Sequence, residues 1–181
     1  MRSGAVEGDA LFVTGSLGDS ALALQLLQAG RQPDPFLLRR HNDPPARVTT
    51  GLALTAAHVP SAMIDISDGL LADLEHILEL SGVGAVVEQQ ALPLSEPFRQ
   101  GLKSNPGLTE LALAGGEDYE LLFTAAETKA DVIAQVAQKC GVPISKVGKI
   151  VAESGQLRLL GPGGELDLPR NRGYKHFPET A

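Results

Sequence analysis

The alternation of apolar and polar residues predicts a chain of short strands and amphipathic helices in mixed order. Apolar runs that end at a glycine or an acid indicate strands at residues 9–15, 61–66 and 82–88. We expect the strand at residues 61–66 to lie in the centre of a sheet. Apolar residues at helical spacing predict further elements, namely a helix that Asp19 or Ser20 caps and Gly30 ends, helices at 45–58, 68–81 and 128–139, and two short helical pieces within 95–113.

Three other stretches complete this pattern. Residues 31–45 contain four prolines and are expected to be connection. Residues 119–124 alternate as a strand, and residues 144–151 and 156–160 are expected to form a hairpin. In the helix at 68–81 the leucines and isoleucine form one stripe, and the opposite face carries polar residues, namely Asp73, His76 and Glu79. The order predicts one sheet with helices packed on it.

Composition narrows the class of protein. The 181 residues suffice for one well-buried core, and a formal net charge of -7 argues against a nucleic-acid partner. The single cysteine, Cys140, excludes an internal disulfide and a multi-cysteine zinc site. We expect no membrane span, since no apolar run approaches the roughly 20 residues that one needs, and the cytoplasm is the expected compartment.

Two acids three residues apart, Asp65 and Asp68, stand where the strand at 61–66 meets the next helix. On one interpretation Asp68 caps that helix and Asp65 is a loop acid bonded to backbone. On the other, both carboxylates coordinate a cation. A bare helix N-terminus attracts phosphate, but two carboxylates there would repel it unless a hard cation such as Mg²⁺ lay between them. Ser67 could then bond a phosphate or ribose, and Gly69 would let a ligand approach the backbone.

Other candidate residues have an ordinary interpretation as well. Glu117 and Asp118 follow paired glycines and could bring a carboxylate to a strand edge, or form a β-turn with a solvated acid. Tyr174 could cover a heteroaromatic ligand or simply pack on the domain. Arg2 could clamp a phosphate or be an exposed arginine. None of the four histidines has the spacing of a metal ligand, and neither a P-loop nor a serine-hydrolase elbow is present.

Together these segments resemble the thiamine-monophosphate kinase family of the aminoimidazole-ribonucleotide-synthetase superfamily. The resemblance covers essentially the whole chain. Its most specific motifs are Asp-Ile-Ser-Asp-Gly at residues 65–69 and Gly-Gly-Glu-Asp-Tyr-Glu-Leu at residues 115–121. It implies an α+β fold, an α/β sandwich with a mixed β-sheet and packed helices.

The resemblance also implies an activity, the phosphorylation of thiamine monophosphate to thiamine diphosphate with ATP and Mg²⁺. Asp65 and Asp68 would be magnesium ligands, Arg2 and Ser67 would contact ATP, and Glu117 and Tyr174 would contact thiamine phosphate. No protein nucleophile is expected, because phosphoryl transfer of this kind depends on positioning and charge neutralisation. The full-length enzymes are expected to be homodimers.

Members of this family are about twice as long as this chain. We therefore expect residues 1–8 to be the remnant of an interdomain link and residues 9–181 a C-terminal domain, with the N-terminal ATP-binding domain absent. Such a chain would bind Mg-nucleotide weakly without turnover. The alternatives are another ATP-dependent synthetase of the superfamily, or a non-catalytic module that binds thiamine phosphates or nucleotides.

Overall fold

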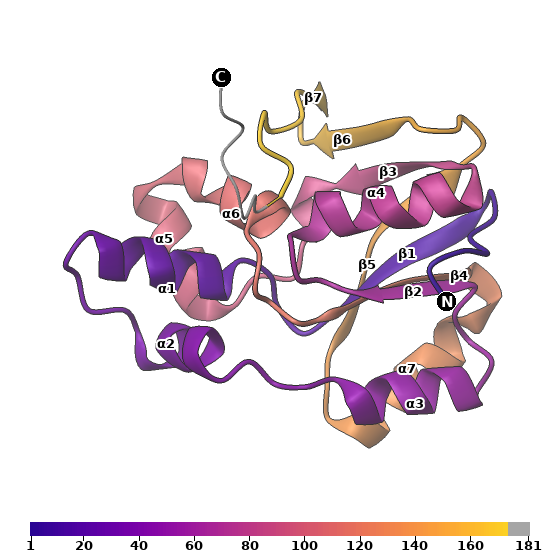
Figure 1. Cartoon of the computed structure of the whole chain (residues 1–181), viewed down its shortest axis with the longest axis horizontal. Coiled ribbons are helices and arrows are strands. Elements are labelled where there is room, and N and C mark those ends of the chain that lie inside the picture. Colours follow the sequence, from indigo (N-terminus) through magenta and orange to yellow (C-terminus); the bar gives the residue numbers. More distant parts are fainter. Residues whose placement is uncertain (174–181) are drawn as a thin grey trace.

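A computed structural model describes residues 1–173 of the chain. Within them one mixed sheet of seven strands has helices on both faces, so the expected α+β sandwich is confirmed (Figure 1). The strands are β1 (Asp9–Thr14), β2 (Ala62–Asp65), β3 (Gly84–Glu88), β4 (Leu121–Ala126), β5 (Ile144–Val151), β6 (Leu157–Gly161) and β7 (Gly164–Leu166). The helices are α1 (Asp19–Gln28), α2 (Pro35–Asn42), α3 (Val48–Ala56), α4 (Leu70–Ser81), α5 (Glu96–Ser104), α6 (Thr109–Ala114) and α7 (Ala130–Cys140). None of these helices is long and apolar enough to cross a membrane.

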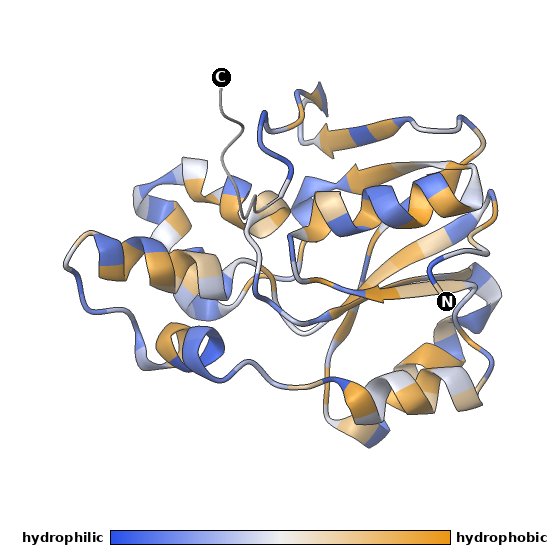
Figure 2. Cartoon of the chain, viewed as in Figure 1, coloured by the Kyte–Doolittle hydropathy of each residue, from blue (hydrophilic) through white to orange (hydrophobic). Residues whose placement is uncertain are grey.

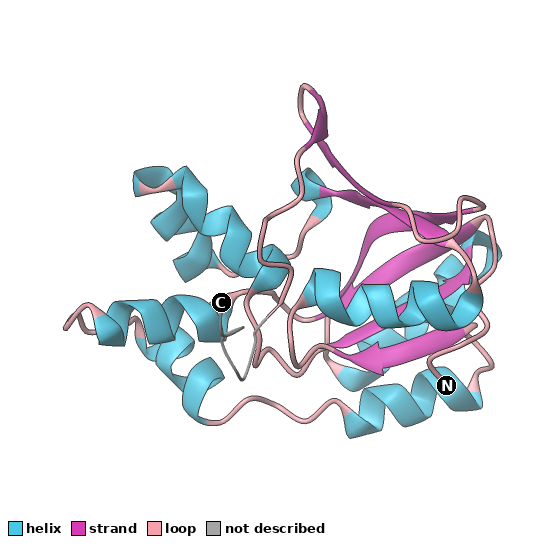
Figure 3. Ribbon diagram, turned by 45° about the horizontal axis from the view of Figure 1, so that its top comes forward, coloured by secondary structure: helices cyan, strands magenta, loops and turns pink. Residues whose placement is uncertain are grey.

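The strands lie in the order β2-β4-β1-β5-β3-β6-β7, and all neighbours are antiparallel except β3 and β6. Alternate residues of β1 and β4 enter two separate cores. On β1, Leu11 joins the core beneath α4, whereas Phe12 faces α3 and α7 and stacks on Phe123 with the ring centroids 5.3 Å apart. Figure 2 shows the apolar residues of the strands. Figure 3 shows the strands between these helical layers.

The expected position of residues 61–66 is wrong, because β2 lies at an edge of the sheet and not in its centre. It pairs with β4 on one side only. On the other side the Met63 N–H donates to the Met1 carbonyl at 2.8 Å. The strand is apolar because Ala62 and Ile64 enter one core and Met63 packs against the other. An apolar run therefore predicts that both faces of a strand are buried, but it does not predict where the strand lies in the sheet.

The stretch 31–45 is not connection throughout, because it contains α2. Asp34 caps this helix by accepting the Phe36 N–H at 2.8 Å, and Pro35 takes the first helical position, where no N–H is needed. The cap expected for α1 is also wrong. Gly18 occupies the N-cap position with a left-handed φ of 78°, and the buried Asp19 is the first helical residue.

The predicted hairpin of residues 144–151 and 156–160 is wrong, because β3 lies between β5 and β6. The turn after β5 passes over the start of β3 at Gly84. A Cβ on Gly84 would lie 2.2 Å from the Glu153 carbonyl oxygen and 2.6 Å from the Gln156 carbonyl oxygen. The sheet order thus depends on a glycine at this crossing.

Replacing Gly84 by alanine should therefore lower the free energy of unfolding by about 1–3 kcal/mol, since backbone atoms must move to admit the methyl group. Urea unfolding followed by circular dichroism measures this. Gly163 is the matched control, because a Cβ there meets nothing within 4 Å. An unfolding free energy equal in G84A and G163A would contradict the crossing.

Candidate functional site

The loop between β2 and α4, residues 66–69, carries the first candidate site. Gly69 takes the N-cap position of α4 with φ 128°. A Cβ there would lie 2.9 Å from the Ala114 backbone, so this glycine allows α6 to pack against the loop. The expectation that Gly69 opens space for a ligand is not supported, since Ala114 fills that space.

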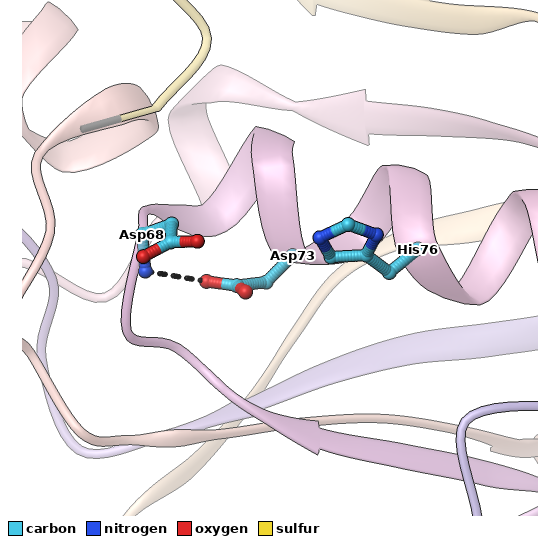
Figure 4. Close-up of side chains that lie close together, drawn as sticks. All are labelled: Asp68, Asp73 and His76. Atoms are coloured by element: carbon cyan, nitrogen blue, oxygen red, sulfur yellow. Dashed lines mark hydrogen bonds between the residues drawn. The ribbon is translucent and has the colours of Figure 1, made fainter. Parts of the chain in front are cut away.

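Within residues 1–173 no side chain caps α4, and Asp73 binds the loop that precedes the helix. Its Oδ2 atom accepts the N–H groups of Ser67 at 3.0 Å, Asp68 at 3.0 Å and Gly69 at 3.1 Å (Figure 4). The sequence places Asp73 on the solvent face, but it is only 2% exposed. Burial raises the pKa of the Asp73 carboxyl, and the N–H groups that it accepts oppose this rise. The capping interpretation of Asp68 is therefore wrong.

The carboxylates of Asp65 and Asp68 remain without a hydrogen bond or ion pair among residues 1–173. Asp65 is exposed and Asp68 is half-buried. Oxygen atoms of Asp68 and Asp73 and a ring nitrogen of His76 lie within 4.8 Å of one another, so the loop offers ligands for a cation (Figure 4). Because Asp73 Oδ2 is already bonded to three N–H groups, Asp65 and Asp68 are the carboxylates best able to coordinate an ion.

The turn that carries Glu117 is bonded directly to this loop. The Glu117 N–H donates to the Ser67 carbonyl and the Tyr119 N–H to the Ile66 carbonyl, both at 2.8 Å. The Tyr119 hydroxyl donates to Glu117 Oε2 at 3.0 Å. That hydrogen bond, the Glu117 charge, partial burial, and the charges of Asp65 and Asp68 all raise the pKa of the Tyr119 phenol. Three exposed or half-exposed carboxylates therefore converge around one phenol.

Asp118, the second acid of this turn, is 1% exposed and not solvated, whereas Glu117 is exposed. Its Oδ2 atom accepts the Gly18 N–H at 2.8 Å. Burial raises its pKa to about 8. Next to it, the buried Glu120 accepts Arg40 at 2.9 Å and Arg47 at 2.6 and 2.7 Å.

The remaining candidate residues, Glu117, Tyr174 and Arg2, lie in different parts of the chain. Glu117 lies at the rim of a cleft of about 1130 Å³ between α1, α6 and residues 166–171. Tyr174 lies outside the described residues, but Gly173 next to it is buried, and a Cβ there would lie 3.0 Å from the Asp68 carbonyl oxygen. Arg2 is exposed at the outer edge of β2 and makes no ion pair within residues 1–173. The structure thus groups Asp65, Ser67, Asp68 and Glu117.

Sequence reasoning missed the residues that hold these groups in place. Asp73 could have been found as a helical acid one turn after a glycine. Its side chain is close enough to reach the N–H groups of the loop just before the helix. Arg40 and Arg47 lie 80 and 73 residues from Glu120. Nothing in the local pattern indicates such a distant pairing.

The mixed sheet with a carboxylate-rich loop at its edge is that of a known domain class. The model of the family "AIR synthase related protein, C-terminal domain" matches residues 6–159, and the chain belongs to this family.

Within the family the chain is similar to thiamine-monophosphate kinases. It is 39% identical to the enzyme of Salmonella typhimurium over 181 residues, which is 97% of this chain and 54% of that protein. A crystal structure of the Stenotrophomonas maltophilia K279a enzyme matches with a TM-score of 0.80 and 37% identity, over 91% of this chain and 53% of that one. A structure of AaThiL complexed with AMPPCP and TMP matches with a TM-score of 0.75 and 32% identity, over 97% and 53%. The resemblance seen in the motifs is confirmed, and the chain spans about half the length of these relatives.

The raised pKa of Asp118 predicts a pH dependence of stability. The native protein holds a proton that the unfolded chain releases above its ordinary pKa of 3.8. The contribution of Asp118 to the free energy of unfolding should therefore fall as pH rises from about 4 to about 8, by up to about 1.4 kcal/mol per pH unit. Urea unfolding at several pH values, compared between the unmodified protein and D118N, measures this. Parallel pH profiles for the two proteins would contradict it.

Because the charges of Glu117, Asp65 and Asp68 raise the pKa of the Tyr119 phenol, we predict that removing any of them lowers that pKa. In a Tyr174→Phe background Tyr119 is the only tyrosine, so its pKa can be measured by ultraviolet absorbance. Replacing Glu117 by glutamine should lower this pKa most, and D65N or D68N should lower it less, because each change removes a negative charge from the phenol's surroundings.

Glu79, exposed near the far end of α4, supplies the control. The E79Q change should leave the Tyr119 pKa where it is. If the Tyr119 pKa is the same in all three site variants as in the Tyr174→Phe protein, the three carboxylates do not lie near this phenol.

Proposed function

We propose that this chain is the C-terminal part of a kinase that uses ATP and Mg²⁺ to phosphorylate thiamine monophosphate to thiamine diphosphate. The observation that carries the proposal is the pair of acids at the start of α4. Asp73 accepts the N–H groups of the loop that precedes the helix, and Asp65 and Asp68 add negative charge with no cation from residues 1–173. Similarity to thiamine-monophosphate kinases supplies the substrates.

The residues present fit magnesium. Mg²⁺ prefers oxygen ligands and is usually held by one or two carboxylates, with water and phosphate oxygens completing its shell. Within residues 1–173 the carboxylates of Asp65 and Asp68 have no other partner, and Asp73 fixes the backbone of the loop at Asp68. They would hold Mg²⁺, which when bound neutralises charge on the phosphates.

The other residues of the site would orient the two substrates. The Ser67 hydroxyl, between the two acids, is proposed to contact ATP, together with Arg2. Glu117, at the rim of the large cleft, is proposed to contact thiamine phosphate, with Tyr174 packing on it. The Tyr119 hydroxyl holds the Glu117 carboxylate in position. No side chain of this site is proposed to form a covalent intermediate.

The chain spans about half the length of its relatives, so the test concerns binding and not turnover. We propose that further metal ligands, the rest of the ATP site and the contacts of a homodimer belong to the part of the relatives that this chain does not match. The cytoplasm is the proposed compartment.

Asp68→Asn separates metal binding from folding. The variant should keep its unfolding free energy within about 0.5 kcal/mol, because the Asp68 carboxylate makes no hydrogen bond or ion pair within residues 1–173. It should lose at least about tenfold in affinity for AMPPCP measured by calorimetry with Mg²⁺, because one carboxylate ligand is gone.

The matched variant is Asp73→Ala, which should be destabilised by about 1–3 kcal/mol, since three N–H groups lose their acceptor. If D68N unfolds more readily while AMPPCP affinity stays unchanged, Asp68 is structural and the proposed function loses its metal site.

A further inference from the structure

The turn at residues 116–120 has an unusual backbone around Asp118. Glu117 has φ 68° and Tyr119 has φ 50°, both in the left-handed region that residues other than glycine rarely adopt. Each such residue costs of order 1–3 kcal/mol and persists only where the surrounding structure imposes it. The two strained residues are exposed, whereas Asp118 between them points into the protein.

Asp118 ties this turn to the start of α1. Its Oδ2 atom accepts the N–H of Gly18 at 2.8 Å. Gly18 itself cannot move freely, because a Cβ there would lie 2.7 Å from the Phe98 ring and 2.9 Å from the Ala112 backbone. The Arg40 guanidinium also donates to the Asp118 carbonyl at 3.1 Å. The side chain and the backbone of Asp118 are therefore anchored to α1 and α2.

The backbone of the same turn is hydrogen-bonded to the loop at residues 66–69. The N–H groups of Glu117 and Tyr119 donate to the carbonyls of Ser67 and Ile66, and the Ile66 N–H donates to the Glu120 carbonyl, all at 2.8 Å. Ile66 and Ser67 are the two residues between Asp65 and Asp68. The path of the turn thus sets how the two acidic ligands stand relative to each other and to Glu117.

Stability alone gives a poor account of Asp118. Its Oδ1 atom is buried without a hydrogen-bond partner among residues 1–173, as are Nε and Nη1 of Arg40. Burying a carboxyl with one oxygen unsatisfied costs free energy. An apolar side chain that fits the space would avoid this cost. A residue that is costly for folding yet bonded to the loop of the site calls for a role in the site.

We propose that Asp118 is a positioning residue, whose buried carboxyl group holds Glu117 and the Asp65–Asp68 loop in the geometry that binds a divalent cation. It acts through the backbone of the turn and touches no ligand itself. This inference rests on the proposed function, because it presupposes that Asp65 and Asp68 bind the cation.

The experiment measures Mn²⁺ affinity by electron paramagnetic resonance, with urea unfolding of each variant in parallel. Asp118→Leu and Asp118→Ser both lose the bond to Gly18 and should bind Mn²⁺ about 10–100-fold more weakly while staying folded, as is typical when the support of a metal ligand is removed. Asp118→Asn keeps an oxygen that accepts the Gly18 N–H and should stay within about threefold of the unmodified protein.

Asp9 supplies the matched control. It is a second buried carboxyl, 4% exposed, that accepts the Val6 N–H and the Ser61 hydroxyl at the far end of β1. Asp9→Leu should lower stability and leave Mn²⁺ affinity unchanged, as a purely structural residue does.

The outcomes separate the inference from the function on which it rests. If the unmodified chain and D68N bind Mn²⁺ alike, the proposed function itself fails. If D68N abolishes binding but folded D118L and D118S bind as the unmodified protein does, Asp118 does not position the site. Loss of folding in both D118L and D118S would assign Asp118 to the fold and would also overturn the inference.

Discussion

Three backbone N–H groups at the junction of β2 and α4 share one acceptor, the Asp73 carboxylate, and the geometry of the candidate site depends on this interaction. These groups belong to the loop that precedes Leu70, the first helical residue, and α4 has no side-chain cap within residues 1–173. The Asp73 carboxylate therefore fixes the backbone of this loop. The same three N–H groups are not available to a phosphate, and we propose that a phosphate meets the loop through a cation.

The second constraint is the turn at residues 116–120, which rests on the first. Its strained residues are held by hydrogen bonds to the loop and by the buried acids Asp118 and Glu120. Glu120 is 0% exposed and is bonded to Arg40, Arg47 and Thr14, so its charge is compensated and its oxygens are satisfied. Buried ion pairs of this kind add little net stability, but they disfavour alternative arrangements of the chain around them.

The sequence was sufficient for the elements with a clear period, and it indicated the loop that carries the candidate site. The stripe of α4 and the acids that follow β2 are visible because they depend on neighbours within a few residues. Strand order was not predictable, since β3 enters between β5 and β6 through contacts of Gly84 with residues about 70 positions away. The role of Asp73 was missed because helical periodicity assigns it to the solvent face, whereas the loop folds back over it.

The distribution of charge explains why one group of acids is structural and the other is open to a ligand. Arg40 and Arg47 are committed to Glu120, and Arg172 pairs with Glu75 on α4. Asp65, Asp68 and Glu117 converge around the Tyr119 phenol, and residues 1–173 bring no arginine or lysine into an ion pair with them. Like charges that lie near one another repel, and such an arrangement is unfavourable for the protein alone. A divalent cation would relieve this repulsion, and we therefore propose that the loop receives a metal-bound phosphate.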